Sequence, residues 1–252
     1  MPTLLILGSK PEPVLPPGGS FDALACANAS GRSAASLGLP DPAFTVMTAA
    51  LTSGHKPAND LALEALRGLR TGKLYLYPRP DSHGFPLKRL LRELRAIRVK
   101  PWYVRRKLRS LGYRFDELIS PRRAFYHDLV LRLCGHDEAI AAQIARKQPS
   151  TGMIALAIGL AEEHFDRLVM SGFSFEITHA YARNPLIDRL GTARSKHAET
   201  DIAVLRCLAG RHRNIYTTEP TVHERAGVPL FEVLRAPAPG RRDAETMRIA
   251  TG

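Results

Sequence analysis

The sequence predicts an α/β protein of Rossmann-like architecture, with a mainly parallel sheet, helices on both of its faces and a helical insertion. Strand-like and helix-like segments alternate near both ends of the chain, which is the pattern of a parallel sheet connected by helices. The first strand-like segment is a continuous apolar run, as expected of a strand buried on both faces. With 252 residues, 44% of them hydrophobic, the chain is long enough to bury a sizeable core.

The N-terminal third is expected to contain strands separated by helices. We predict strands over residues 3–7, 21–28, 43–48 and 72–78. The first is closed by Gly8 and Ser9, and the last alternates in polarity and is rich in aromatic residues. Helical segments are predicted over 30–38 and 57–70, and the second opens with Pro57, a residue suited to the first helical turn.

The middle of the chain is predicted to be mostly helical. Over residues 86–148 we expect helical pieces that break at Pro101, at 110–114 and at 119–123. Because this part interrupts the alternation of strands and helices, we assign residues 79–148 to a helical insertion over the carboxyl edge of the sheet.

The alternation then resumes towards the C-terminus. The expected order is a helix over 151–163, a strand over 166–173, a helix over 196–209 and a strand over 213–219. We therefore predict one domain over residues 1–235 that includes the insertion. Residues 236–252 are rich in proline, glycine and charge, which predicts a flexible tail.

The net charge of +12 is concentrated in one part of the chain. In residues 86–114 Glu93 is the only acidic residue, and leucines fall on one side of a helix with arginines and lysines on the other. Trp102 and Tyr103 stand at a break in this stretch. We expect it either to lie on an anionic membrane surface or to pack its leucine face on the sheet. Nucleic acid is an unfavoured partner, because few other aromatic residues suited to base stacking are present.

The cysteines and the apolar runs bear on the cellular compartment. Three cysteines at unrelated spacings fit buried thiols in a reducing compartment better than a disulfide framework. The longest apolar run, 153–161, is too short to cross a bilayer, and no cationic region precedes the apolar residues 4–7. We therefore expect a cytoplasmic protein whose contact with the inner membrane, if made through residues 86–114, is peripheral.

The ends of the predicted strands point to one binding crevice. In open parallel sheets, ligands bind beyond the carboxyl ends of the strands, at the point where the strand order reverses. The residues expected around such a crevice are Gly8, Ser9, Asn28, Ala29, Ser150, Thr151, Gly152, Gly172 and Phe173.

Pro149 to Gly152, with the sequence PSTG, stand directly before a strongly apolar predicted helix. Unpaired amides and two hydroxyls at a helix N-terminus attract an anion such as a phosphate. The alternative is ordinary N-capping by Ser150 or Thr151. The dinucleotide fingerprint GxGxxG and the Walker A pattern are both absent, and the lack of an Asp-x-Asp sequence argues against a metal-bridged diphosphate donor.

The histidines supply the candidate catalytic groups. His179 and Tyr181 lie a few residues after Phe173, in a predicted loop. His197 stands at a helix start with Asp201 one turn later, and a carboxylate partner suits a general base near neutral pH. The alternative is a surface pair without a catalytic role. The histidines and cysteines do not have the spacing of a zinc site, so we expect no bound metal.

Taken in chain order, these segments resemble the motifs of the animal-type sialyltransferase family. LLILGS with FDALACANAS stands for the large motif, and PSTGMIALAIGL with DRLVMSGFSF for the small motif. HAY stands where the family has His-Tyr-Tyr, and HAETD follows its His-x-x-x-Glu with Asp201 in place of glutamate. The matched segments cover well under half of the chain.

The chain also departs from the family pattern. The cysteine pair that joins the large and small motifs is missing, and so is an N-terminal membrane anchor. Both departures suit a bacterial relative. Residues 79–148 match no motif of the family, so the resemblance concerns the donor half of the site.

The resemblance implies an inverting, metal-independent glycosyltransferase that needs no cofactor. Its donor would be a CMP-activated acidic sugar, of the sialic acid or the Kdo type, and its acceptor a hydroxyl of a glycan or glycolipid. By the family pattern, Gly8, Ser9, Asn28 and Ala29 would contact the nucleotide and phosphate. His197, helped by Asp201, would be the general base, and His179 would bind the leaving phosphate together with the 150–152 helix start.

Other readings remain open from the sequence. One is a polyanion-binding protein that uses the basic helices, with the sheet as a scaffold. Another is a nucleotide-binding protein without transferase activity.

Overall fold

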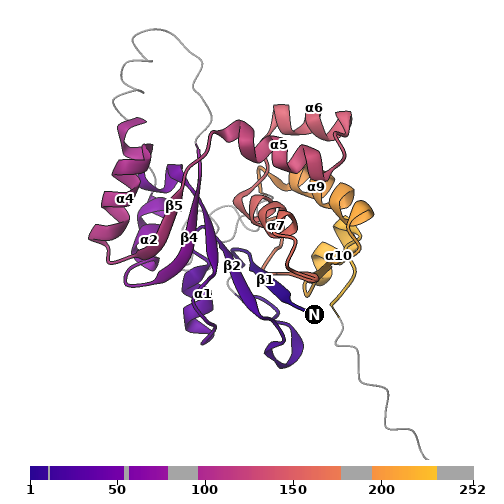
Figure 1. Ribbon diagram of the computed structural model, residues 1–252, viewed down its shortest axis with the longest axis horizontal. Helices are drawn as coiled ribbons and strands as arrows, with labels where there is room; N and C mark the ends of the chain where they lie inside the picture. Colours follow the sequence, from indigo (N-terminus) through magenta and orange to yellow (C-terminus); the bar gives the residue numbers. More distant parts are fainter. Residues whose placement is uncertain (11, 54–56, 79–95, 177–194, 232–252) are drawn as a thin grey trace, which may run out of the picture.

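A seven-stranded parallel sheet forms the centre of the protein. The computed structural model describes residues 1–10, 12–53, 57–78, 96–176 and 195–231 (Figure 1). The strands are β1 (Thr3–Leu7), β2 (Ala23–Ala27), β3 (Phe44–Thr48), β4 (Arg70–Tyr77), β5 (Arg114–Ile119), β6 (Arg167–Ser171) and β7 (Ile215–Thr217). All neighbouring strands pair in parallel. The predicted α/β class with a mainly parallel sheet is confirmed.

The order of the strands in the sheet reverses beside β1. In space the order is β5-β4-β3-β2-β1-β6-β7, so the chain winds outward from β1 to β5 and then returns to add β6 on the other side of β1. Leu7, at the end of β1, is in register with Ser171, at the end of β6. The loops after these strands therefore leave the sheet at the switch point, where ligands bind in such folds.

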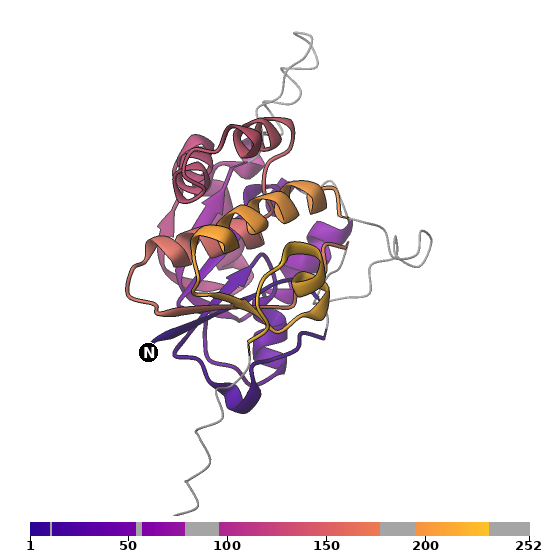
Figure 2. The ribbon, with the colours of Figure 1, turned by 90° about the vertical axis from the view of Figure 1, so that its right-hand side faces the viewer.

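Helices cover both faces of the sheet (Figures 1 and 2). On one side lie α1 (Gly31–Ser36), α2 (Pro57–Ala65) and α4 (Pro101–Ser110), and on the other α5 (Arg123–Leu133), α6 (Glu138–Arg146), α7 (Thr151–Ala161), α9 (Ala198–Arg211) and α10 (Pro220–Ala226). Short 3₁₀ turns occur at η1 (Pro17–Gly19), η2 (Ala49–Ser53) and η3 (Ile97–Val99). Successive residues of a strand face opposite sides of the sheet. In β1, Leu4 and Ile6 pack on the α7 side, and Leu5 and Leu7 pack on the α1 side.

Helix α7 is the central helix of its face. It packs across β1, β2, β3 and β6, and every residue from Thr151 to Gly159 is buried. A helix that is apolar all round is expected to be buried in this way. Gly159 lets it approach the sheet, because a Cβ atom there would lie 2.6 Å from Cδ2 of Leu4. The apolar sequence of 153–161 is thus explained by packing, while the N-terminus of the helix reaches the carboxyl edge of the sheet.

The structure differs from the expected run of helices at 114–119. These residues form β5, an edge strand that pairs only with β4. Its charged residues Arg114, Asp116 and Glu117 are exposed, while Phe115 and Leu118 pack partly against the core. Charged side chains are common on edge strands, where they oppose further pairing, and here they resemble the polar face of a helix. The extent of the insertion and the tail after 235 remain predictions, because residues 79–95 and 232–252 lie outside the described part.

The apolar face of α4 points into the core of the protein. Val104 and Leu108 are fully buried in a core formed with α2, η2 and the sheet. Arg105, Arg106 and Arg109 are exposed on the opposite side. For this part of the basic stretch, the apolar face belongs to the core and cannot enter a membrane. None of the helices in the described ranges is long and apolar enough to cross a bilayer.

We predict that Leu108→Ala lowers the free energy of unfolding by about 2–5 kcal/mol, the usual cost of truncating a buried leucine. The matched control on the same helix is Arg106→Ala, which should change it by about 0.5 kcal/mol or less because the side chain is exposed. Chemical denaturation of both variants measures the difference. Equal effects of the two substitutions would contradict the assignment of this face to the core.

Candidate active site

Asn28, Thr48 and Thr151 come together at the carboxyl edge of the sheet. Asn28 follows β2, and its Nδ2 donates to Oγ1 of Thr151 at 2.8 Å, while its Oδ1 accepts the Thr48 amide at 3.0 Å. The backbone of Asn28 is left-handed, with φ of 54°, a conformation that asparagine tolerates better than most residues. The structure therefore places the predicted residues 28 and 151 in direct contact. Asn28 uses both ends of its amide to hold β3 and α7.

The start of α7 combines capping with amides that have no partner in the described part of the chain. Ser150 is the N-cap, and its Oγ accepts the Met153 amide at 3.4 Å. The Ser150 amide donates to Oδ1 of Asp201 at 2.8 Å. Among the described residues, no intramolecular acceptor is found for the amides of Thr151 and Gly152. Since these amides lie at the positive end of the helix dipole, the capping and anion-binding interpretations are compatible.

The glycines at this edge of the sheet make room for the ring of Phe173 and for the turn at Gly172 that precedes it. A Cβ atom at Gly152 would lie 2.4 Å from Cε1 of Phe173, and one at Gly8 would lie 2.3 Å from the carbonyl oxygen of Gly172. Gly172 itself has φ of 73°. Phe173 is buried between these segments. The absence of side chains at positions 8 and 152 is thus explained by packing, whether or not a ligand approaches.

Two other predicted nucleotide contacts have different surroundings. Ala29 is buried, and its methyl group packs in the core on the α2 side. Ser9 is half-buried in the loop after β1. His179 and Tyr181 lie outside the described residues.

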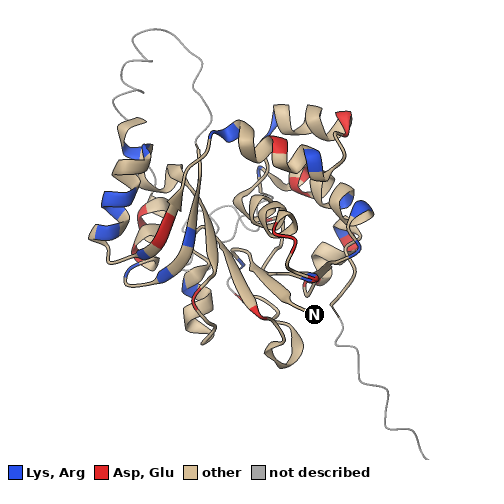
Figure 3. Ribbon diagram, in the orientation of Figure 1, with Lys and Arg blue, Asp and Glu red and all other residues tan. Residues whose placement is uncertain are grey.

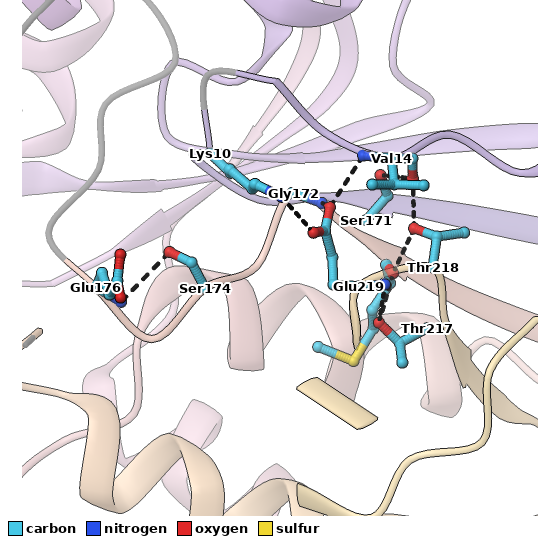
Figure 4. Close-up of polar contacts among 10 residues, drawn as sticks. Lys10, Val14, Ser171, Gly172, Ser174, Glu176, Thr217, Thr218 and Glu219 are labelled. Atoms are coloured by element: carbon cyan, nitrogen blue, oxygen red, sulfur yellow. Dashed lines mark hydrogen bonds and ion pairs between the residues drawn. The ribbon is translucent and has the colours of Figure 1, made fainter. Parts of the chain in front are cut away.

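Glu219 organises the switch point, although no motif in the sequence singles it out. Its side chain is 2% exposed, and Oε1 accepts the Gly172 amide at 2.9 Å and the Val14 amide at 3.0 Å. Its Oε2 pairs with Nζ of Lys10 at 2.6 Å (Figure 4). The Val14 carbonyl in turn accepts the hydroxyls of Ser171 and Thr218. The loop after β1 and the turn after β6 are thereby fastened to the end of β7.

Only one signal could have found Glu219, namely its position as the last residue of the predicted strand 213–219. The same rule had selected Asn28, but an acidic residue before Pro220 also resembles an ordinary helix start. Its partner Lys10 is distant in sequence, so no local pattern joins them.

The imidazole of His197 has a defined tautomer. Its Nδ1 lies 2.8 Å from the carbonyl oxygen of Gln148, which can only accept, so Nδ1 carries the proton and Nε2 the lone pair. Burial lowers the pKa of His197, Lys196 and Lys147 act in the same direction, and the bond to Gln148 opposes them. The ring is therefore neutral near pH 7, with Nε2 able to take up a proton, as a general base requires.

Asp201 is not the hydrogen-bond partner of His197 that the sequence predicted. Its carboxylate accepts the Ser150 amide, whereas the orienting partner of His197 is the Gln148 carbonyl. One-turn spacing places two side chains on the same helix face, but here Asp201 turns into the interior and is 7% exposed. Burial raises the pKa of the Asp201 carboxyl to about 7, and its hydrogen bonds with Ser150 limit the rise. Asp201 therefore positions the start of α7.

Gln148 adds a polar atom that the sequence did not indicate. Its side-chain Oε1 is buried and has no hydrogen-bond partner among the described residues. An unpaired buried acceptor costs about 1–3 kcal/mol, so a donor from a ligand would be favoured there. At the end of β4, Tyr77 Oη lies 2.9 Å from Nε2 of His127, which brings a second imidazole to the same edge of the sheet.

The described part of the chain contains no group of three or more His, Cys, Asp or Glu side chains that could hold a metal ion. The described residues also line two surface hollows. One, of about 490 Å³, is lined by Arg70, Arg109 and Arg114 where β4 and β5 begin. The other, of about 560 Å³, lies among α6, α9 and α10. Neither contains the residues predicted from the sequence.

The fold is similar to that of a solved sialyltransferase structure, and two further structures match with lower scores. A variant of the sialyltransferase Cst-II in complex with CMP matches with a TM-score of 0.53 and 11% identity, over 94% of this chain and 89% of that chain. The monofunctional alpha-2,3-sialyltransferase Cst-I from Campylobacter jejuni gives a TM-score of 0.49 and 12% identity, over 91% and 80% of the two chains. CstII from the same organism with CMP-3FNeuAc gives 0.48 and 13%, over 91% and 86%.

At such identities the similarity to the Cst-II structure shows a common fold and nothing finer. No protein-family model and no curated protein sequence matches the chain.

We predict a specific pH dependence of stability for Asp201→Asn. The folded pKa of about 7 lies above the ordinary value of 3.8, so between these values the folded state binds the proton that the unfolded state has lost. The stabilisation by the protonated carboxyl is complete below about pH 4 and disappears as the pH rises through 7. The unfolding free energy of the wild type, relative to the variant, should fall by roughly 1.4 kcal/mol per pH unit in that interval.

Urea titrations of both proteins from pH 4 to pH 8 measure this difference. Because the asparagine side chain retains an oxygen that can accept the Ser150 amide, the comparison isolates the ionisation. A constant difference across that range would show that Asp201 titrates at its ordinary pKa.

Proposed function

We propose that the protein is a glycosyltransferase that moves an acidic sugar from a CMP-activated donor to a hydroxyl of a glycan or glycolipid. The observation that carries the proposal is the junction at 148–152. There a helix N-terminus, whose Thr151 and Gly152 amides have no acceptor among the described residues, adjoins an imidazole of fixed tautomer, and Gln148 contacts His197 directly. The fold shared with the CMP-bound Cst-II structure and the order of the sequence motifs support the same conclusion.

The start of α7 is proposed to bind the phosphate of CMP. Its dipole and the amides of Thr151 and Gly152 form a preorganised site for the negative charge that grows on the leaving phosphate. His179 and Tyr181 are proposed to complete this site. Such donors can take the place of a metal ion, so the reaction needs neither a metal nor another cofactor.

His197 is proposed to activate the acceptor. Its Nε2 takes the proton of the acceptor hydroxyl as that oxygen attacks the anomeric carbon, and the bond to the CMP phosphate breaks with its electron pair staying on the phosphate. A single displacement from the opposite face inverts the anomeric centre. The Gln148 carbonyl orients the ring, and Asp201 holds the helix start against which the phosphate lies.

The nucleotide is proposed to lie along the ends of β1, β2 and β6. Gly8 and Ser9 would contribute backbone groups, Asn28 would hold Thr151 in position, and Ala29 would contribute its backbone. Gly172 and Phe173 would form the wall beside them. Oε1 of Gln148, which has no hydrogen-bond partner in the described ranges, suits an N–H or O–H donor of a bound ligand.

A cytoplasmic location is part of the proposal. Cys26, Cys134 and Cys207 are free thiols, which suits a reducing compartment.

Turnover measured separately with CMP-sialic acid and CMP-Kdo distinguishes the two donor types. The second candidate is a nucleotide-binding protein without transferase activity. Such a protein would not need His197 as a general base.

CMP should raise the melting temperature of the protein selectively, while AMP, UMP and NAD at equal concentration should not. The double variant Ser150→Ala, Thr151→Val removes the N-cap of α7 and the bond from Asn28, which position the phosphate-binding amides, together with two hydroxyls that can donate to the phosphate. It should bind CMP more weakly by at least about tenfold, since a hydrogen bond to a charged group contributes about 1.5–3 kcal/mol. Isothermal titration measures the affinity independently of any loss of stability. The control is Ser36→Ala, Ser110→Ala, two exposed serines in other helices. Unchanged CMP affinity in the first variant would remove this helix start from the site.

His197→Ala should lower kcat by about 10²–10⁴-fold and leave CMP affinity intact, because the base acts on the acceptor. His179→Ala should lose both. The control is His164→Ala, whose exposed side chain lies outside the site. Turnover with a CMP-sugar and CMP titration are measured on the same preparations. If His197→Ala loses CMP binding and His179→Ala retains it, the two roles are reversed.

A further inference from the structure

The outer side of η3 and α4 forms a cationic surface, which we call the α4 basic face. It consists of Arg98, Lys100, Arg105, Arg106 and Arg109, together with Ile97 and Trp102, and all of them are exposed. No acidic residue occurs from 94 to 114. Figure 3 shows these cations on the side of the molecule opposite α9 and α10. The buried side chains of Val104 and Leu108 fix the helix so that its cations point outward.

The positive charge of this face is not neutralised within the described part of the chain. Arginines nearby do form ion pairs: Arg67 with Glu64, and Arg70 with Asp116. No such pair is found for Arg105, Arg106 or Arg109 among the described residues. A concentration of like charges is unfavourable for the isolated fold, and an anionic partner relieves it.

Apolar side chains stand among these cations. Trp102 is 59% exposed and Ile97 is 42% exposed. Tyr103 meets Trp102 edge-on, with ring centroids 5.8 Å apart and planes at 79°. Tryptophan beside lysine and arginine is typical of a membrane interface, where the ring enters the headgroup region. An exposed isoleucine contributes nothing to base stacking, so the mixture favours lipid over nucleic acid.

One end of the α4 basic face lies at the same edge of the sheet as the candidate active site. Oγ1 of Thr52 donates to the carbonyl oxygen of Arg98 at 2.5 Å, which joins η3 to η2. Since η2 directly follows β3, this junction lies at the carboxyl edge, where Thr48 bonds to Asn28. A surface bound through α4 would therefore lie beside the edge of the sheet that carries the candidate active site.

We infer that the α4 basic face docks the protein on an anionic membrane surface, with the carboxyl edge of the sheet next to the lipid headgroups. The contact is electrostatic and interfacial, because the apolar side of α4 is in the core. The claim of membrane docking stands apart from the proposed transferase function. Its consequence, that a lipid-linked glycan is the natural acceptor, rests on that function.

Trp102 is the only tryptophan of the chain, so its fluorescence reports directly on this surface. The full chain is mixed with vesicles of phosphatidylcholine alone and with vesicles that also contain phosphatidylglycerol, at moderate salt. We expect a blue shift of the emission and co-sedimentation with the anionic vesicles only. Both should weaken as salt is added, since exposed charges are screened.

The variant Arg105→Gln, Arg106→Gln should bind the anionic vesicles about 30-fold more weakly, as expected when two cations leave an anionic surface. The control Arg132→Gln, Arg213→Gln makes the same change of charge at exposed positions elsewhere and should bind as the wild type does. Melting temperatures of both variants show that each is folded.

The inference is overturned if the wild type stays in the supernatant with anionic vesicles, or if the two variants bind equally. It is also overturned if a short DNA duplex, at equal phosphate and salt, binds more tightly than the vesicles and quenches Trp102 without a blue shift. The last result would assign the face to nucleic acid. CMP is absent from all these measurements, so their failure and a failure of the proposed function are distinguishable.

Discussion

Glu219 lies almost completely buried where the ends of β1, β6 and β7 converge, and its carboxylate holds their loops in one arrangement. Each of its oxygens has a partner: the amides of Gly172 and Val14 on one, the Lys10 ammonium on the other. A buried carboxylate is tolerated only with such compensation, and removing one partner typically costs about 3–5 kcal/mol. The shape of the switch point therefore depends on this single side chain.

The candidate site follows from that constraint through direct contacts. Glu219 fixes Gly172, the turn at Gly172 directs Phe173, and the ring of Phe173 packs against Gly152 at the start of α7. From the other side, α9 fixes the same helix start through Asp201. The N-terminus of α7 is thus held by two separate groups of contacts. Preorganisation of this kind is what a phosphate site without a metal requires.

Most of the fold could be predicted from the sequence because its pattern is local. Continuous apolar runs mark the strands that are buried on both faces, and α7 is recognisable from its apolar length alone. The strand β5 escaped prediction because an edge strand carries charges on its open side, which gives a segment such as 114–119 the appearance of a helix surface. The sequence also could not decide whether the apolar face of α4 packs against the sheet or meets a membrane, since a leucine face suits both equally.

The sequence by itself determined the fold class and the chain segments that reach the carboxyl edge, because strand ends can be located from periodicity and glycine turns. It also selected Asn28, Ser150, Thr151 and His197, which the structure gathers at that edge. Only the tertiary structure decided the partners. It paired His197 with the Gln148 carbonyl, turned Asp201 to the Ser150 amide and joined Glu219 to Lys10. The reason is physical: a hydrogen bond is decided by direction and distance in three dimensions, and residues far apart in the chain leave no periodic trace of it.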